Sequence, residues 1–204
     1  MIAIIDYGVG NLFSLQSSFA MIGAEAVVTG EADVIRGTDR LILPGVGAFQ
    51  DAADKLRCAG LDRLIIDEAE RGKPILGICL GMQMLFQESH EFGVHQGLGL
   101  LPGRVVPMEP ELPEGLKVPH IGWNALHLAN PEHPLFRYTR EGDCVYFVHS
   151  YYAAECGDSL LATAEYGIDV TAAVGDGNVL GCQFHPEKSG PVGLGILRAF
   201  CEMR

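Results

Sequence analysis

The sequence predicts an α/β protein with a mostly parallel central sheet, flanked by helices and extended by antiparallel strands in the C-terminal half. Up to residue 87, short apolar runs alternate with amphipathic segments, and the runs are apolar on both faces, as in a buried parallel sheet. From residue 104 onward, strand-like runs follow one another through turn-rich connections, with few helical patterns. Antiparallel strands joined to a parallel core explain this change.

The first half begins with an apolar run at residues 2–5, which we expect to be a strand. Leu12, Leu15, Phe19 and Ile22 follow it with the spacing of one helix face. Further strands are expected at 24–29, 40–43 and 74–79, and helical patterns at 61–69 and from Met82 to Phe86. The helix at 61–69 should end near Gly72, because glycine suits a left-handed C-terminal position.

The second half contains six expected strands and one helix. The strands are expected at 104–108, 123–128, 145–149, 160–165, 171–174 and 179–184. Gly190-Pro191 begins the last helix, and Val192, Ile196, Leu197 and Phe200 should face inward. No linker composition separates the halves, so we expect one domain over residues 1–204.

Composition excludes several classes of protein. With 14 Lys+Arg against 26 Asp+Glu, the chain has a formal charge of −12, and its field would repel nucleic acid. Hydrophobic residues make up 48% of the chain, as in a well-packed globular protein. No apolar stretch approaches the roughly 20 residues that span a bilayer.

The N-terminus and the cysteines indicate the compartment. The start of the chain has no basic segment before its apolar residues and reaches Asp6 at once, unlike a signal peptide. The six cysteines include no C-x-x-C pair and no zinc-site spacing. We therefore expect a cytoplasmic protein with reduced thiols, no metal and no membrane partner.

The most informative segment is Gly77-Ile78-Cys79-Leu80-Gly81, at the end of an apolar strand and the start of a helical pattern. This is the arrangement of a nucleophile elbow with Cys in place of Ser. The sharp turn would hold Cys79 in a strained conformation, expose its thiol at the carboxyl end of the sheet, and favour the thiolate. A buried cysteine on a glycine-containing strand is the alternative interpretation.

A nucleophilic thiol needs a base, and His185 is the best candidate among seven histidines. It ends an expected strand, and Pro186 should keep it extended. Because residues i and i+2 of an extended segment point the same way, Glu187 could orient the imidazole. A surface His-Pro-Glu turn is the alternative, but the elbow cysteine elsewhere in the chain favours a catalytic pair.

These residues resemble the class I, triad-type glutamine amidotransferases over the whole chain, and imply their three-layer α/β fold. Within that family the sequence is similar to the glutaminase subunits of imidazole glycerol phosphate synthase. The matching segments are Asp6-Tyr7-Gly8 with Gly10-Asn11, Pro44-Gly45-Val46-Gly47, Pro119–Asn124, Tyr146–Tyr151 and His185–Ser189. Val46 is the most specific feature, because most relatives have Pro-Gly-Gly or Ser-Gly-Gly at this loop.

The resemblance implies a Cys79, His185 and Glu187 triad that hydrolyses L-glutamine without a cofactor. It places the oxyanion hole at Leu80 and the loop of Gly45, Val46 and Gly47. It also assigns glutamine binding to Gln83, Glu91, Ser150 and Tyr151. The implied partner is a (β/α)₈-barrel cyclase, which receives ammonia across an interface containing Asn11, Trp123, Tyr146 and Lys188.

Several of these residues, taken one at a time, could also have a purely structural role. Gln83 could be an exposed helix residue, Glu91 part of an acidic loop, and Tyr151 a sheet aromatic. Trp123 follows a glycine among turn residues, which favours exposure, yet tryptophan more often anchors a core.

Three other functions stay open at this point. The chain could be a glutaminase of the same fold that serves a pyridoxal phosphate or GMP synthase. It could be a silent binding module that keeps the elbow only as a turn. It could also be a cysteine hydrolase acting on peptides or small electrophiles. Val46 and the His185–Ser189 run argue against the first, and the intact triad residues argue against the second.

Overall fold

The computed structural model describes residues 1–203 and is built around a sheet of eight strands within them. The strand order is β2-β1-β3-β4-β14-β13-β12-β9. These strands span Ala26–Thr29, Ile2–Ile5, Arg40–Leu43, Ile75–Ile78, Val179–Cys182, Asp169–Asp176, Leu160–Glu165 and His127–Leu128, in that order. The strands from β2 to β14 are parallel, and β13, β12 and β9 continue the sheet in antiparallel pairs.

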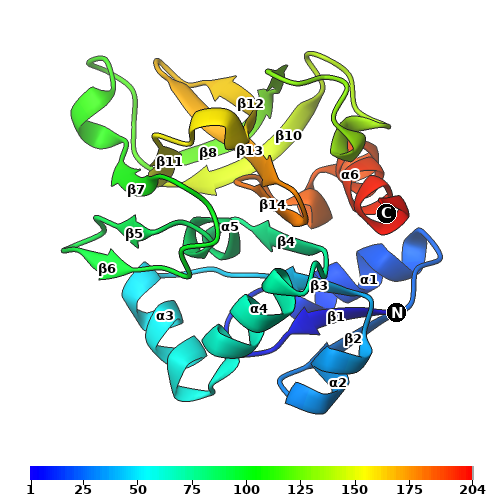
Figure 1. Ribbon diagram of the computed structural model, residues 1–204. Helices are drawn as coiled ribbons and strands as arrows, with labels where there is room; N and C mark the ends of the chain where they lie inside the picture. The colour runs from blue at the N-terminus through cyan, green and yellow to red at the C-terminus, as the bar shows by residue number, and fades with distance from the viewer. Residues whose placement is uncertain (204) are drawn as a thin grey trace.

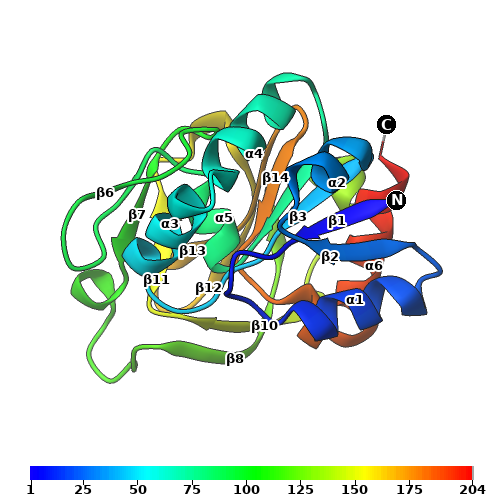
Figure 2. The same ribbon diagram turned by 90° about the horizontal axis from the view of Figure 1, so that it is seen from below.

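Helices cover both faces of this sheet (Figures 1 and 2). The helices are α1 Leu12–Met21, α2 Ala32–Gly37, α3 Phe49–Cys58, α4 Leu61–Glu70, α5 Leu80–Met84 and α6 Gly190–Glu202. In Figure 2, α1 and α6 lie on one face, whereas α2, α3 and α4 lie on the other. The predicted α/β class, a mostly parallel sheet with antiparallel strands added in the C-terminal half, is confirmed.

The central sheet has a hydrophobic core on each of its two faces, and side-chain alternation along β1 explains this arrangement. Ile2 and Ile4 pack with Phe19 of α1 and with α6, whereas Ala3 and Ile5 pack with α2, α3 and α4. Successive residues of a strand point to opposite faces, so a strand apolar at every position needs cover on both.

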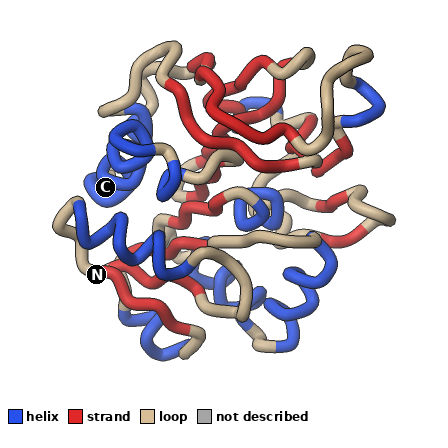
Figure 3. Tube along the Cα trace, turned by 180° about the vertical axis from the view of Figure 1, so that it is seen from behind, coloured by secondary structure: helices blue, strands red, loops and turns tan. Residues whose placement is uncertain are grey.

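Two smaller sheets lie beside the central one, and the strands of all three are red in Figure 3. One pairs β8 (His120–Ala125) with β10 (Cys144–His149) in antiparallel register. The other has the order β11-β7-β5-β6, with bounds Tyr151–Ala154, Arg104–Pro107, Glu88–Ser89 and His95–Gln96. Because β10 and β11 are separated by Ser150 alone, the two small sheets meet at that residue.

Two helices (α2 and α3) and three strands (β5, β6 and β11) were not predicted, and the expected strands at 123–128 and 179–184 have other bounds in the structure. The missed α3 has buried residues at Phe49, Ala52, Ala53 and Leu56, which is helical spacing, but alanines carry a weak apolar signal. The strand expected at 123–128 is two: β8 ends at Ala125 and β9 begins at His127. The missed α2 is only six residues long, and the strand expected at 179–184 ends at Cys182.

All six cysteines are free in the structure. Cys58 and Cys144 are exposed, whereas Cys79, Cys156 and Cys182 are buried. Among residues 1–203, no helix combines the length and apolar character needed to cross a membrane.

Candidate active site

The site forms where β4 and β14 end. These parallel neighbours pair Ile78 with Cys182, and the Cys79 amide donates to the Cys182 carbonyl at 2.8 Å. Carboxyl ends of parallel strands lie at one edge of a sheet, where α/β proteins place their ligand sites. The residue after β4 and those after β14 are therefore neighbours, although about a hundred residues separate them in the sequence.

Cys79 has the strained backbone expected of an elbow, with φ 53° and ψ −113°. This conformation is rare for a residue with a side chain and is found mostly at functional sites. The turn also brings α5 against β3: a Cβ on Gly81 would lie 1.8 Å from the Leu43 carbonyl oxygen. Glycine at position 81 is thus required for the close approach that holds the elbow.

His185 and Glu187 form the expected pair. His185 is extended (φ −97°, ψ 99°), and Glu187 lies in the single turn Pro186–Lys188. His185 Nδ1 and Glu187 Oε1 are 2.9 Å apart, and both side chains are buried. Two hydrogen bonds hold the backbone of His185 in place: its amide donates to the Tyr146 carbonyl, and its carbonyl accepts from Ser189 Oγ.

The environment of His185 favours its protonated form. Burial lowers the pKa of this ring, but the nearby Cys79 sulfur and the Glu187 carboxylate outweigh burial and raise it to about 9. Its Nε2 is buried and has no hydrogen-bond partner among residues 1–203. A protonated, oriented imidazole with one free nitrogen can donate a proton to a leaving group beside Cys79.

A cavity of about 680 Å³ lies over Cys79 and His185. Most of the residues assigned to oxyanion and glutamine binding line it: Val46, Gly47, Leu80, Gln83, Glu91, Ser150 and Tyr151. Lys188 lines it as well, and Phe92, Glu109, Val118, Pro119, Val148 and His149 complete the wall. Gly45 lies behind the wall, where an added Cβ would come within 2.9 Å of the Leu80 Cβ.

Gln83 and Glu91 do not have the plainer roles considered for them. Gln83 is buried, and its Nε2 donates to the Tyr151 carbonyl at 3.1 Å and to Gln183 Oε1 at 2.9 Å. The Glu91 carboxylate accepts from the Phe49 amide at 2.6 Å, at the first turn of α3. Glu91 thus stabilises a helix N-terminus while also lining the cavity.

The loop after β3 can contribute to an oxyanion site. Leu80 is the first residue of α5, so its N–H has no partner within the helix. The Pro44 carbonyl accepts from the Tyr7 hydroxyl at 2.7 Å, which anchors the start of the loop. Burial, reinforced by the nearby Cys79, raises the pKa of Tyr7, so this hydroxyl stays protonated and donates.

Three of the four expected interface residues form one cluster beside the cavity. The Trp123 and Tyr146 rings meet edge to face with centroids 6.2 Å apart, and Lys188 Nζ lies 5.7 Å from the Tyr146 centroid. Trp123 is 57% exposed, so it is no core anchor. Asn11, the fourth residue, immediately precedes α1.

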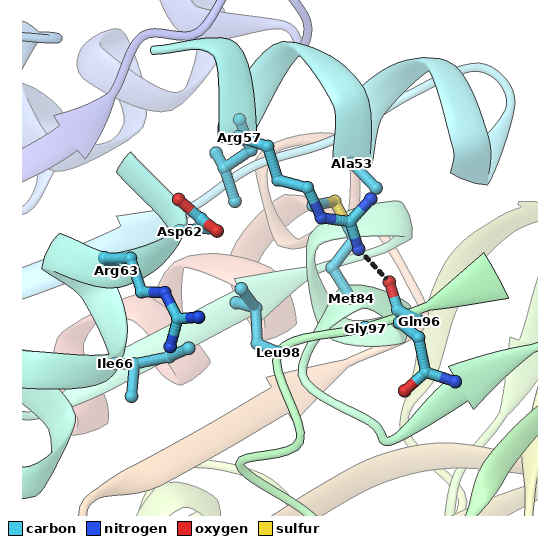
Figure 4. Close-up of a pocket in the computed structure, with 10 residues that line it drawn as sticks. Ala53, Arg57, Asp62, Arg63, Ile66, Met84, Gln96, Gly97 and Leu98 are labelled. Carbon is cyan, nitrogen blue, oxygen red and sulfur yellow. Dashed lines mark hydrogen bonds between the residues drawn. The ribbon is translucent and has the colours of Figure 1, made fainter. Parts of the chain in front are cut away.

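Figure 4 shows a second hollow, of about 280 Å³, between α3, α4 and the segment after β6. Arg57 and Arg63 lie at its edge, Met84 and Leu98 line it, and Arg57 donates to the Gln96 carbonyl. Its lining contains none of Cys79, His185 and Glu187, so the larger cavity is the candidate active site.

Two buried histidines next to the site were missed by the sequence analysis. His120 Nδ1 and His149 Nε2 are 3.0 Å apart, and His149 Nδ1 lies 2.9 Å from the Tyr151 carbonyl. Because a carbonyl only accepts, His149 Nδ1 carries the hydrogen, and His120 then donates to His149. Burial lowers the pKa of each ring to about 4, so both are neutral at neutral pH.

The two neutral histidines predict that the folded protein loses stability in mild acid. Unfolding lets each ring gain a proton below about pH 6.5, so the stability contributed by the neutral rings falls as the pH drops from about 6.5 toward 4. The free energy of unfolding of the wild type should fall when the pH is lowered from 7.5 to 5. We expect this fall to be about 2 kcal/mol smaller in His149→Asn. Urea denaturation at both pH values measures this.

A control uses Ser159→Ala, which removes a buried hydrogen bond to the Cys156 carbonyl without removing a titratable group. It should lower stability by about the same amount at both pH values. Identical pH dependence in the wild type and His149→Asn would show that His149 is not held neutral by the fold.

Comparison with known proteins identifies the family. The model of the glutamine amidotransferase class-I family matches residues 3–202. The chain therefore belongs to the class I glutamine amidotransferases, as its resemblance predicted.

Full-length relatives point to one branch of that family. The chain is 50% identical over 207 aligned residues to "Imidazole glycerol phosphate synthase subunit HisH" of Syntrophotalea carbinolica, with all of both chains covered. A protein of the same name from Bacillus subtilis is 49% identical, covering 100% of this chain and 96% of that protein. Among solved structures, "Structure of PurLQS from Thermotoga maritima" matches with a TM-score of 0.76 at 21% identity, covering 98% and 96% of the chains, which supports the fold.

Proposed function

We propose that this chain is the glutaminase subunit of an imidazole glycerol phosphate synthase. It hydrolyses L-glutamine to glutamate and ammonia, and the ammonia passes to a cyclase subunit that forms imidazole glycerol phosphate and AICAR in histidine biosynthesis. The single observation that carries the chemistry is the strained Cys79 next to the buried His185–Glu187 pair. Identity near 50% over full length to proteins named as synthase subunits supports the pathway.

The first half of the reaction forms a thioester. The Cys79 thiolate attacks the side-chain amide carbon of glutamine, and the carbonyl oxygen becomes an oxyanion. The Leu80 N–H and an N–H from the loop of residues 45–47 stabilise that charge. When the tetrahedral intermediate collapses, the C–N bond breaks, and the nitrogen leaves as ammonia with a proton from His185.

The second half releases glutamate. His185, now neutral, accepts a proton from water as the water oxygen attacks the thioester carbon. The C–S bond breaks, the thiolate is restored, and glutamate leaves. Throughout both steps Glu187 holds the ring through Nδ1, so Nε2 remains directed to the reacting atoms.

The remaining wall of the cavity binds the substrate. Gln83 uses its N–H groups on Tyr151 and Gln183, which leaves its Oε1 to accept from the glutamine. Glu91 supplies a negative charge for the α-amino group, and Ser150 and Tyr151 supply groups from the junction of β10 and β11. These roles follow the family resemblance and the position of each residue around one cavity.

A (β/α)₈-barrel cyclase is the proposed partner. The exposed Trp123, with Tyr146 and Lys188, lies on the same side as the cavity, since Lys188 belongs to both. A partner docked there would receive ammonia close to where it is released. A cytoplasmic location and a single domain over residues 1–204 are part of the same proposal.

Co-expression with a candidate cyclase tests this function. We expect the two chains to remain together through gel filtration and to form imidazole glycerol phosphate with glutamine as nitrogen donor. Pairing instead with a GMP or pyridoxal phosphate synthase, or hydrolysis of peptides without any glutaminase activity, would contradict the assignment.

A further inference from the structure

Gln183 lies beside the reacting sulfur, although neither the motifs nor the resemblance drew attention to it. It follows β14 directly, and its side chain is fully buried. Cys182 and Phe184 point into the apolar core, so the alternation of an extended chain turns Gln183 to the same side as His185. Gln183 Nε2 is 3.6 Å from Cys79 Sγ.

The orientation of the Gln183 amide is determined by its neighbours. The Tyr151 carbonyl can only accept a hydrogen bond, so the group of Gln83 next to it must be the NH₂. That same NH₂ is 2.9 Å from Gln183, which must therefore present its oxygen to Gln83. The NH₂ of Gln183 is then left to face Cys79, so the hydrogen bonds run in one direction from Gln83 through Gln183 to the sulfur.

The sulfur has a better donor than acceptor nearby. Besides the protonated His185, the donor is Gln183 at 3.6 Å, and the acceptor is the Val148 carbonyl at 4.0 Å, the limit of a contact to sulfur. A hydrogen-bond donor aimed at a group stabilises its anionic form. We propose that Gln183 is a further catalytic residue, whose side-chain N–H stabilises the Cys79 thiolate for attack and again when the thioester C–S bond breaks.

Several titratable groups surround the Gln183 side chain and the Cys79 sulfur. His185, with Glu187 behind it, faces the sulfur from the segment after β14, and Tyr7 approaches from the end of β1. The others near the site are Cys182 on β14, His149 on β10, and Glu91, Glu109, Tyr151 and Lys188 in the cavity wall. A substitution at position 183 leaves all of these in place, so a change in pH response is attributable to the lost donor.

This inference rests on the proposed function, but its test is independent of glutamine hydrolysis. Alkylation by iodoacetamide reports the thiolate directly and needs no substrate. In the complex with the cyclase, we expect Gln183→Met to lower the alkylation rate of Cys79 on the rising limb of its pH profile by roughly three- to tenfold, because the thiolate fraction falls while the less stabilised thiolate is the better nucleophile. The rising limb of the alkylation rate should move to higher pH, and kcat for glutamine should fall more than KM rises.

Gln183→Glu provides a second variant that keeps the acceptor for Gln83. Its carboxylate replaces the donor with a negative charge, so the fall in alkylation should be at least as large as in Gln183→Met. The exposed Gln87, changed to Met, is the matched control and should leave the rate and its pH response unchanged. Ammonium-dependent cyclisation by each complex shows that the variants have folded and docked.

The proposal is overturned if Gln183→Met and Gln183→Glu both keep the wild-type alkylation rate and pH profile. A fall in kcat with an unchanged alkylation profile would also overturn it, because that result indicates packing alone. If no glutaminase activity is found in the wild type, while the alkylation profile still shifts in the variants, the proposed function fails and the hydrogen bond to the thiolate is upheld.

Discussion

Cys79→Ala is expected to abolish glutamine-dependent synthesis by the complex while leaving ammonium-dependent synthesis intact. The sulfur is the only group of the triad that bonds covalently to the substrate, and no step of thioester chemistry remains without it. Oxyanion and substrate contacts alone leave little catalysis, so the glutaminase rate should fall by more than about a hundredfold. Ammonia release and imidazole glycerol phosphate formation are measured on the same preparation.

The exposed Cys58 supplies the matched control. Cys58→Ala removes a thiol of the same intrinsic chemistry at a position outside the cavity, and both activities should stay near the wild-type values. Activity above about one hundredth of wild type in Cys79→Ala would refute the nucleophile assignment. A variant inactive with both nitrogen sources would instead mean that this subunit is required for the cyclisation itself.

The elbow at Cys79 and the His185–Glu187 pair could be predicted because each follows from local backbone rules. A Gly-x-Cys-x-Gly segment between strand and helix forces the turn at Cys79. Pro186 keeps His185 extended, and the short distance to Glu187 then lets the carboxylate reach Nδ1. The adjacency of β4 and β14, which joins the two parts, was implied only by the family resemblance.

The polar network around Cys79 and His185 could not be predicted, because its members lie on elements that are distant in sequence. Gln183 meets Gln83 across the end of the sheet, and His120 meets His149 through the β8–β10 register. One residue of slip in the β8–β10 pairing would turn the two histidines away from each other. The polar residue at 183, two positions before His185 and directly after an apolar run, was the one available signal.

The last prediction concerns the loop of residues 44–47, which should make glutamine hydrolysis nearly silent in the isolated chain. Its start is fixed, since the Pro44 carbonyl is bound by Tyr7 and Gly45 packs against Leu80. Its tip is not: Val46 is 43% exposed at the edge of the cavity, and Gly47 has a positive φ of 96°. The Gly45–Val46 peptide plane can therefore rotate without repacking the core.

The orientation of the Gly45–Val46 peptide plane determines whether its N–H or its carbonyl faces the oxyanion. An N–H directed into the cavity would stabilise the developing charge, whereas a carbonyl would repel it. A partner docked on Trp123, Tyr146 and Lys188 lies beside the cavity wall to which Lys188 belongs, so its binding can favour the N–H orientation. A bias of about 3 to 5 kcal/mol corresponds to a rate change of roughly 10² to 10⁴.

We therefore expect glutaminase kcat to rise by that factor from the isolated chain to the complex carrying the nucleotide substrate of the cyclase. Three measurements of kcat test it: the isolated chain, the complex, and the complex with nucleotide bound. Replacing Gly45 with alanine should reduce activity in all three states, because an added Cβ would lie 2.7 Å from the Gly81 nitrogen and displace the loop. Equal kcat values in the three wild-type states would reject the switch, even with every triad assignment correct, since a loop that already presents its N–H gives the partner nothing to change.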